Sequence, residues 1–274
     1  GMSLILYLRR MIDFYWTSMK QAIMLEFQYR VANYFYMIGM VAEPVIYLVV
    51  WSTIARSQGG SVGGYTPGAF AAYYIVWTLV RNMNIVLTPY AWEGRIRRGQ
   101  LSMELVRPLH PLHFDVAFFA GWKIVAIILW LPLAAGLSLV FKPELHPTWY
   151  QAVAFFVAIW GAYLIRTMLL TLLGLITFWT TRVGAIFELF FAIELVISGR
   201  LVPMSLMPEW VQRVAVFFPF QWTFGFPIEA LVSQMSPVEL LRGLGIQVMW
   251  IVIGLVSVKV LWRFAVKQFS AVGG

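Results

Sequence analysis

Six long apolar stretches constrain the fold of this chain more than any other feature of its sequence. Hydrophobic residues make up 61% of the 274 residues and charged residues 12%, whereas soluble domains average about 45–50% and roughly 25%. A soluble fold of this length could not hide so much apolar surface. Aromatic residues at 17%, with 13 Trp, suit a protein with two lipid–water interfaces, where Trp and Tyr concentrate. The sequence therefore predicts an all-α integral membrane protein with one transmembrane domain over residues 1–274.

We predict that each of the six stretches spans the bilayer, whose hydrocarbon core of about 30 Å needs about 20 helical residues. The fourth is unusually long, so it is expected to tilt or to extend into the cytoplasm. The fifth stops short at Ser198-Gly199. The predicted spans are residues 31–54, 69–90, 118–140, 149–178, 183–198 and 244–262.

Residues 3–28 precede the first span and alternate two kinds of side chain with helical spacing. Leu4, Leu8 and Ile12 fall on one face, and Arg9 and Lys20 fall on the other. An amphipathic helix with basic residues and aromatics is typical of a helix lying in the membrane surface. A helix in a soluble core is the alternative, which the following spans disfavour.

Prolines interrupt the apolar segment between the fifth and sixth spans every few residues. Residues 199–227 contain Pro203, Pro208, Pro219 and Pro227, so the segment cannot cross as one straight helix. Irregular backbone at membrane depth persists only where protein or a water-filled cavity satisfies its polar groups. We predict short re-entrant helices that dip back from the outer surface.

Lys and Arg are distributed unevenly between the two sides of a six-span arrangement. The N-terminal segment, the connector over residues 92–113 with nearby Lys123, the fourth-to-fifth turn and the C-terminal end hold about twelve or thirteen, against five on the other side. The side with more positive charge is normally cytoplasmic. Both termini are therefore predicted to be cytoplasmic, and anionic lipid explains the net charge of +8 better than nucleic acid does.

A few charged residues lie within the predicted spans, where a charge is costly unless it is protonated, paired or hydrated. Glu43-Pro44 stands in the middle of the first span. Glu43 either faces a translocation path or a subunit seam, or is held by a neighbouring helix for structure alone. Arg166 is expected to pair with Glu188 or Glu194.

The chain lacks the motifs of several catalytic sites. It has no G-x-x-x-x-G-K-[ST] loop, no H-E-x-x-H, no G-x-S-x-G and no cysteine, so it cannot hold nucleotide phosphates by itself. We expect no catalytic residue, no metal site and no cofactor in this chain.

Three motifs, in this order, resemble the membrane subunit of type-2 ABC exporters. The first is the N-terminal helix leading through Glu26-Phe-Gln-Tyr-Arg-Val-Ala-Asn33 into the first span. The second is the connector Ile96-Arg-Arg-Gly-Gln-Leu-Ser-Met-Glu-Leu-Val-Arg-Pro-Leu109, which departs from the family pattern at Gln100, where an acidic residue is common. The third is Ser198-Gly-Arg-Leu-Val-Pro203, followed by Met207-Pro-Glu-Trp-Val211 and Phe218-Pro-Phe220.

The resemblance implies a coupling helix between the second and third spans that seats on a separate nucleotide-binding ATPase carrying Mg-ATP. It also implies two permease subunits, either two copies or a pair of paralogues, whose first and fifth spans meet at the dimer seam. By position, the coupling residues are Arg95, Ile96, Arg97, Arg98, Gly99, Gln100, Leu101, Leu105 and Arg107. The outer re-entrant gate comprises Gly199, Leu201, Pro203, Pro208, Trp210 and Pro219, and the translocation path or dimer seam includes Glu43, Pro44 and Glu194.

The expected function is that of a permease subunit that exports an amphiphilic or bulky substrate (a drug, lipid, glycolipid or polysaccharide) across the inner, or plasma, membrane. The partners are the ATPase, the second permease and membrane lipids, and no nucleic acid. The alternative is a transporter driven by a proton gradient, with Glu43 or Glu194 as the proton carrier. An intramembrane enzyme would need a polar constellation that the sequence lacks.

Overall fold

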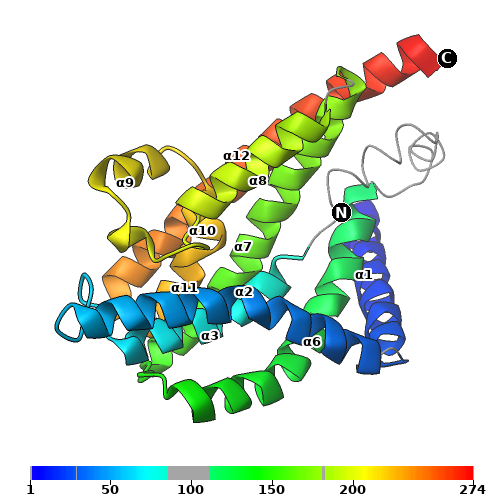
Figure 1. Cartoon of the computed structure of the whole chain (residues 1–274). Coiled ribbons are helices and arrows are strands. Elements are labelled where there is room, and N and C mark those ends of the chain that lie inside the picture. Colours follow the sequence, from blue (N-terminus) through cyan, green and yellow to red (C-terminus); the bar gives the residue numbers. More distant parts are fainter. Residues whose placement is uncertain (1, 29, 86–110, 181–182, 274) are drawn as a thin grey trace.

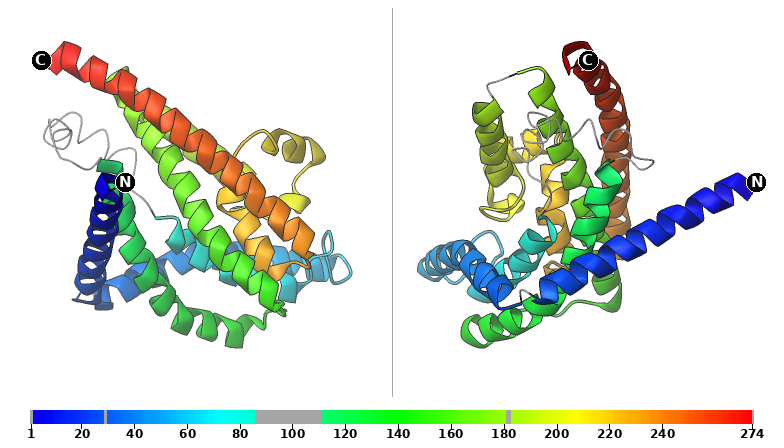
Figure 2. Two further views of the ribbon diagram at one scale, coloured as in Figure 1. Left: turned by 180° about the vertical axis from the view of Figure 1, so that it is seen from behind. Right: turned by 90° about the vertical axis from the view of Figure 1, so that its right-hand side faces the viewer.

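The computed structural model describes residues 2–28, 30–85, 111–180 and 183–273, and it is helical nearly throughout. In the described part, the β-structure is one isolated bridge between Val62 and Tyr65. Both chain ends lie away from the loop of residues 58–66 (Figures 1 and 2). The expected coupling segment falls in residues 86–110, outside the described residues.

The N-terminal helix α1 (Met2–Gln28) packs along α6 (Pro111–Phe141), as Figure 1 shows. A glycine allows this approach, because a Cβ at Gly121 would lie 2.6 Å from the Cβ of Ala22 and 2.8 Å from the carbonyl oxygen of Met19. Most of α1 remains exposed, including Leu4, Leu8 and Ile12. Such an apolar surface suits contact with lipid.

Helices α2 (Arg30–Ser57) and α3 (Pro67–Met83) pack against each other as a hairpin. The start of α3 follows from local sequence, since the Thr66 hydroxyl accepts a hydrogen bond from the Ala69 amide and Pro67 occupies the first turn. Residues 70–80 are buried on every face of α3. The helix ends at Met83, where Asn84 caps it, and the last part of the span predicted over residues 69–90 lies outside the described residues.

Helix α7 (Trp149–Leu175) continues into the short 3-10 turn η1 (Ile176–Phe178) and packs along α12 (Pro237–Gly273). On each helix, a side chain from the other helix packs against a glycine. A Cβ at Gly161 of α7 would lie 2.7 Å from Oε1 of Gln247, and a Cβ at Gly254 of α12 would lie 2.7 Å from Sδ of Met168. The two helices therefore make close contact at two levels (Figure 2).

Between α8 (Val183–Ile197) and α12 the chain forms four short helices. They are η2 (Met204–Leu206), α9 (Glu209–Ala215), α10 (Phe220–Thr223) and α11 (Gly225–Val232). Proline precedes three of them, at positions 203, 208 and 219, because it fixes φ for a first turn and cannot continue a preceding helix. Helix α11 packs against α7 and α3.

Four helices of the described residues are long and apolar enough to cross a membrane: Ile38–Ser57, Ala120–Phe141, Trp149–Leu175 and Pro237–Gln268. The other two predicted spans correspond to α3, with 17 residues, and α8, with 15 residues. At 1.5 Å per residue they measure about 26 Å and about 22 Å, short of a core of about 30 Å. The protein is thus a helical membrane protein, and six complete spans stay a prediction.

Candidate functional site

The turn that follows α8 is the most tightly held piece of irregular backbone in the predicted gate. Gly199 has φ of +92°, a conformation that side-chain-bearing residues rarely adopt. The amide of Gly225 donates to the carbonyl oxygen of Ser198 at 2.8 Å. A Cβ at Gly199 would lie 2.9 Å from the Cα of Gly225 and 2.8 Å from the hydroxyl of Tyr73. Both the backbone angle and the contacts therefore require glycine here.

Three aromatic side chains of α3 hold this turn. The hydroxyl of Tyr73 donates to the carbonyl oxygen of Gly199 at 2.6 Å. The hydroxyl of Tyr74 donates to the carbonyl oxygen of Leu201 at 2.8 Å. Nε1 of Trp77 donates to the carbonyl oxygen of Arg200 at 2.7 Å. Three successive carbonyls of this irregular backbone thus have hydrogen-bond partners, as membrane-embedded irregular backbone requires. We call these three side chains and residues 199–201 the turn cradle.

A salt bridge connects the turn cradle to α2. The Arg200 guanidinium donates to both carboxylate oxygens of Glu43, at 2.7 and 2.8 Å. Both side chains are partly buried, at 19% and 33% exposure. A bidentate pair of this kind fixes orientation as well as charge. The neighbour that holds Glu43 is therefore the turn, while Pro44 is buried within α2.

A second, more deeply buried salt bridge joins α7 to α8. The Arg166 guanidinium donates to both carboxylate oxygens of Glu194, at 3.0 and 3.1 Å. Its remaining amino group donates to the carbonyl oxygen of Asn84 at 2.6 Å, beyond the end of α3. Of the two partners that the sequence allowed for Arg166, the structure selects Glu194, and Glu188 is exposed.

The end of α3 is tied to two further elements. Nδ2 of Asn84 donates to the carbonyl oxygen of Thr223 in α10 at 2.6 Å. The side-chain amino group of Lys123 on α6 donates to the carbonyl oxygen of Ile85 and contacts the carbonyl oxygen of Asn82 at 3.5 Å. It thus gives a partner to a carbonyl that the end of the helix leaves free. Lys123 is fully buried, so it does not belong with the exposed cytoplasmic cations.

The two salt bridges surround a small void of about 10 Å³, room for about one water molecule. This space is too small for a substrate. The void is lined by Arg81, Asn84, Arg166, Glu194, Ser198, Arg200, Thr223 and Phe224.

The predicted gate residues occupy different parts of the segment. Gly199 and Leu201 lie in the turn cradle, and Pro203 precedes η2. Pro208 and Trp210 lie at the start of α9, where Trp210 is 68% exposed. Pro219 precedes α10. The predicted coupling residues Arg95 to Arg107 lie outside the described residues.

Sequence reasoning missed the residues that hold the turn, Tyr73, Tyr74 and Trp77, and the contacts of Asn84 and Lys123 at the end of α3. A signal was present, since Tyr and Trp in a buried helix normally find hydrogen-bond partners for their polar atoms. The positions 73, 74 and 77 also fall on one side of a helix. Their partner, however, lies more than 120 residues away.

Comparison with curated proteins gives no match to the sequence. Comparison with protein families gives a match over most of the chain. The family described as ABC-2 family transporter protein matches residues 41–273, from the middle of α2 to the end of α12. This match includes the turn cradle and both salt bridges. The chain therefore belongs to the ABC-2 transporter family.

Proposed function

We propose that this chain is the permease subunit of an ATP-driven exporter and that the turn cradle is the closed outer gate of its path. The observation that carries the proposal is the set of three hydrogen bonds from α3 to residues 199–201. The same helix leads toward residues 86–110, the expected coupling segment. One helix would therefore connect the ATPase contact to the gate.

The salt bridges support a gate that opens as a unit. Arg200 ties the turn to α2 through Glu43, and Arg166 ties α7 to α8 through Glu194. Lifting the turn would separate Arg200 from Glu43 and break the cradle bonds together. Such coupled contacts give two discrete arrangements rather than a continuous range.

The exposed apolar faces of α2 and α8 support a second permease subunit at this surface. Helix α2 exposes Ile46, Val49 and Val50, and α8 exposes Leu189 and Ile193. Either a second copy or a paralogue would cover these faces. Lipid covers the remaining apolar surface in the plasma membrane, with both termini cytoplasmic.

The proposed substrate is amphiphilic or bulky (a drug, lipid, glycolipid or polysaccharide), and ATP hydrolysis belongs to the partner ATPase with its Mg-ATP. Transport driven by a proton gradient has less support, because both proposed carriers are engaged. Glu43 and Glu194 each form a bidentate pair with an arginine, so both carboxylates already have a partner in this arrangement.

The coupling assignment predicts that Arg97→Glu with Arg98→Glu abolishes stable association with the ATPase. Losing even one charge-assisted hydrogen bond of about 1.5–3 kcal/mol weakens binding at least tenfold. Co-purification of the ATPase and substrate-stimulated ATP hydrolysis in proteoliposomes provide the measurement. Arg213→Glu is the control, since Arg213 is exposed on α9 and pairs only with Glu209 among the described residues. Normal ATPase association in the double variant would contradict the assignment.

A further inference from the structure

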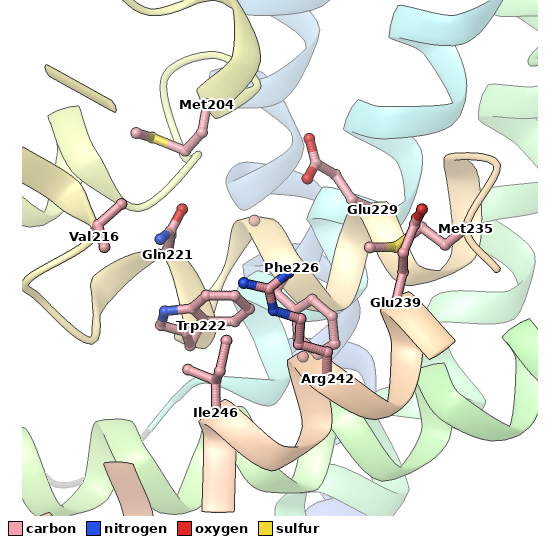
Figure 3. Close-up of a pocket in the computed structure, with 12 residues that line it drawn as sticks. Met204, Val216, Gln221, Trp222, Phe226, Glu229, Met235, Glu239, Arg242 and Ile246 are labelled. Atoms are coloured by element: carbon pink, nitrogen blue, oxygen red, sulfur yellow. The ribbon is translucent and has the colours of Figure 1, made fainter. Parts of the chain in front are cut away.

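A cavity separate from the turn cradle lies between α10, α11 and the first turns of α12. Its volume is about 370 Å³, within the range of about 300–1,000 Å³ of small-molecule pockets. Figure 3 shows its lining residues, which come from the chain between η2 and α12 and from α12 itself. They are Met204, Val216, Gln221, Trp222, Gly225, Phe226, Glu229, Met235, Glu239, Arg242, Gly243 and Ile246.

One part of the cavity wall is charged with both signs. Glu229, Glu239 and Arg242 line it, and no salt bridge joins any of them to another described residue. The hydroxyl of Tyr65 lies 3.4 Å from Oε1 of Glu229, a long hydrogen bond. Burial raises the pKa of the Glu229 carboxyl to about 7. The hydrogen bond from the Tyr65 hydroxyl acts on this pKa in the opposite direction and is the smaller effect. The Glu239 carboxylate and the Arg242 guanidinium have no salt-bridge partner among the described residues and are available to a ligand, and the Glu229 carboxyl lies in the same wall.

The other part of the wall is apolar and aromatic. In Figure 3 the Arg242 guanidinium points between the Trp222 and Phe226 rings, with Glu229 and Glu239 to one side and Val216 to the other. The floor is fixed, because a Cβ at Gly243 would lie 2.1 Å from Cε2 of Phe226. Charged and apolar walls in one cavity suit an amphiphile rather than an inorganic ion.

The depth of the cavity matches a lipid headgroup. The apolar span of α12 begins at Pro237, so Glu239 and Arg242 lie in its first two turns and Ile246 lies one turn deeper. Charged side chains at the start of a span lie at the level of the headgroups. An amphiphile seated here would have its polar end beside Arg242 and its chain beside Ile246.

We propose that this cavity binds a zwitterionic amphiphile with a phosphate and a primary ammonium, such as a phosphatidylethanolamine of the surrounding leaflet. Arg242 holds the phosphate, and Glu239 and Glu229 receive the ammonium, since charge-assisted hydrogen bonds of this kind are short and strong. A purely anionic headgroup would leave the Glu239 carboxylate facing its charge. A purely cationic one would face the guanidinium. Binding at this site requires neither ATP nor the partner ATPase, so the inference is independent of the proposed function.

Native mass spectrometry of the purified full-length chain tests the proposal by titration with dihexanoyl phosphatidylethanolamine, dihexanoyl phosphatidylglycerol and free phosphoethanolamine. We expect the phosphatidylethanolamine to bind at least tenfold more tightly than either of the others. Arg242→Gln should weaken its binding about tenfold, the effect of about one charge-assisted hydrogen bond. Glu239→Gln should reduce the preference for phosphatidylethanolamine over phosphatidylglycerol.

Two further variants separate a specific site from general effects. Arg213→Gln removes an exposed guanidinium of the same segment outside the cavity and should leave binding unchanged. Ile246→Trp fills the apolar end and should reduce binding while both charges remain. Equal binding of phosphatidylglycerol would overturn the assignment to a zwitterion, and equal binding of free phosphoethanolamine would overturn the assignment to an amphiphile. Wild-type binding by Arg242→Gln would overturn the site itself.

Discussion

Gly199 shows how much of the proposed gate depends on single atoms. Its positive φ and its contacts with Gly225 and Tyr73 leave no space for a side chain. The sequence placed this glycine in a motif that resembles a family signature, but it could not reveal which neighbours surround the glycine. Those neighbours belong to α3 and α11, and only packing brings them together.

Gly199→Ala should therefore destabilise the folded protein by about 1–3 kcal/mol, the usual cost of a strained backbone position. The measurement is thermal unfolding in detergent, followed by circular dichroism. Gly245→Ala provides the control, because no atom lies within 4 Å of a Cβ at this exposed position in α12. It should be neutral or slightly stabilising, since alanine favours helix over glycine. Equal stability of the two variants would contradict the packing of the turn.

Arg166 and Glu194 form the other residue-scale feature, a pair only 10% and 6% exposed. Glu194→Gln should cost about 3–5 kcal/mol, because it leaves a buried guanidinium without its counter-charge. The double variant Arg166→Met, Glu194→Leu should recover part of that loss, since it removes both charges. Chemical unfolding in detergent compares the variants. Arg213→Gln, which breaks an exposed pair, should change stability by about 0–1 kcal/mol. A small effect of Glu194→Gln alone would mean that the pair is hydrated.

At the scale of elements, α3 unites most of what the sequence left separate. The apolar pattern predicted a span ending at Tyr90, and the helix ends at Met83. The reason is local and tertiary together: Asn84 caps the helix and bonds to Thr223, and Lys123 and Arg166 satisfy the carbonyls beyond it. Hydropathy shows how long an apolar stretch is. It contains no information about side chains such as Lys123 of α6 and Arg166 of α7, which bond to the end of α3.

Trp77→Phe should shift the gate toward its open arrangement, since it leaves the Arg200 carbonyl without a partner when the turn is closed. The loss of about 1–3 kcal/mol corresponds to a five- to 150-fold change in population. The chain has no cysteine, and Ser198 is fully buried, so Ser198→Cys supplies one reporter thiol. Its modification by a water-soluble maleimide should accelerate in the Trp77→Phe background.

Trp130→Phe on the same reporter is the matched control. Nε1 of Trp130 donates to the hydroxyl of Thr78 at 2.7 Å, so this variant also removes an indole hydrogen bond to α3 but none to the turn. Its maleimide rate should equal that of the reporter alone. Similar acceleration by both tryptophan variants would show that general loosening of α3, rather than release of the turn, exposes the thiol.

At the scale of the molecule, composition and apolar length were sufficient to predict a helical membrane protein. The prolines were sufficient to place a broken segment before the last span, because proline acts on the chain locally. Long-range pairing was not accessible in the same way. The sequence left open whether Glu43 faces a path or seam or is held by a neighbouring helix, and its partner Arg200 is 157 residues away and was counted among the cations of the outer side. The cavity beside Arg242 likewise depends on how α11 meets α12.

The two glycine contacts between α7 and α12 limit how the whole molecule can move. Gln247 of α12 enters α7 at Gly161, and Met168 of α7 enters α12 at Gly254. Because the two insertions point in opposite directions at different heights, both would have to be undone before either helix could slide along the other. We therefore expect the pair to move as one unit. If the proposed gate opens, the motion would then take place between this pair and the α2–α3 hairpin, where the hydrogen bonds of the turn lie.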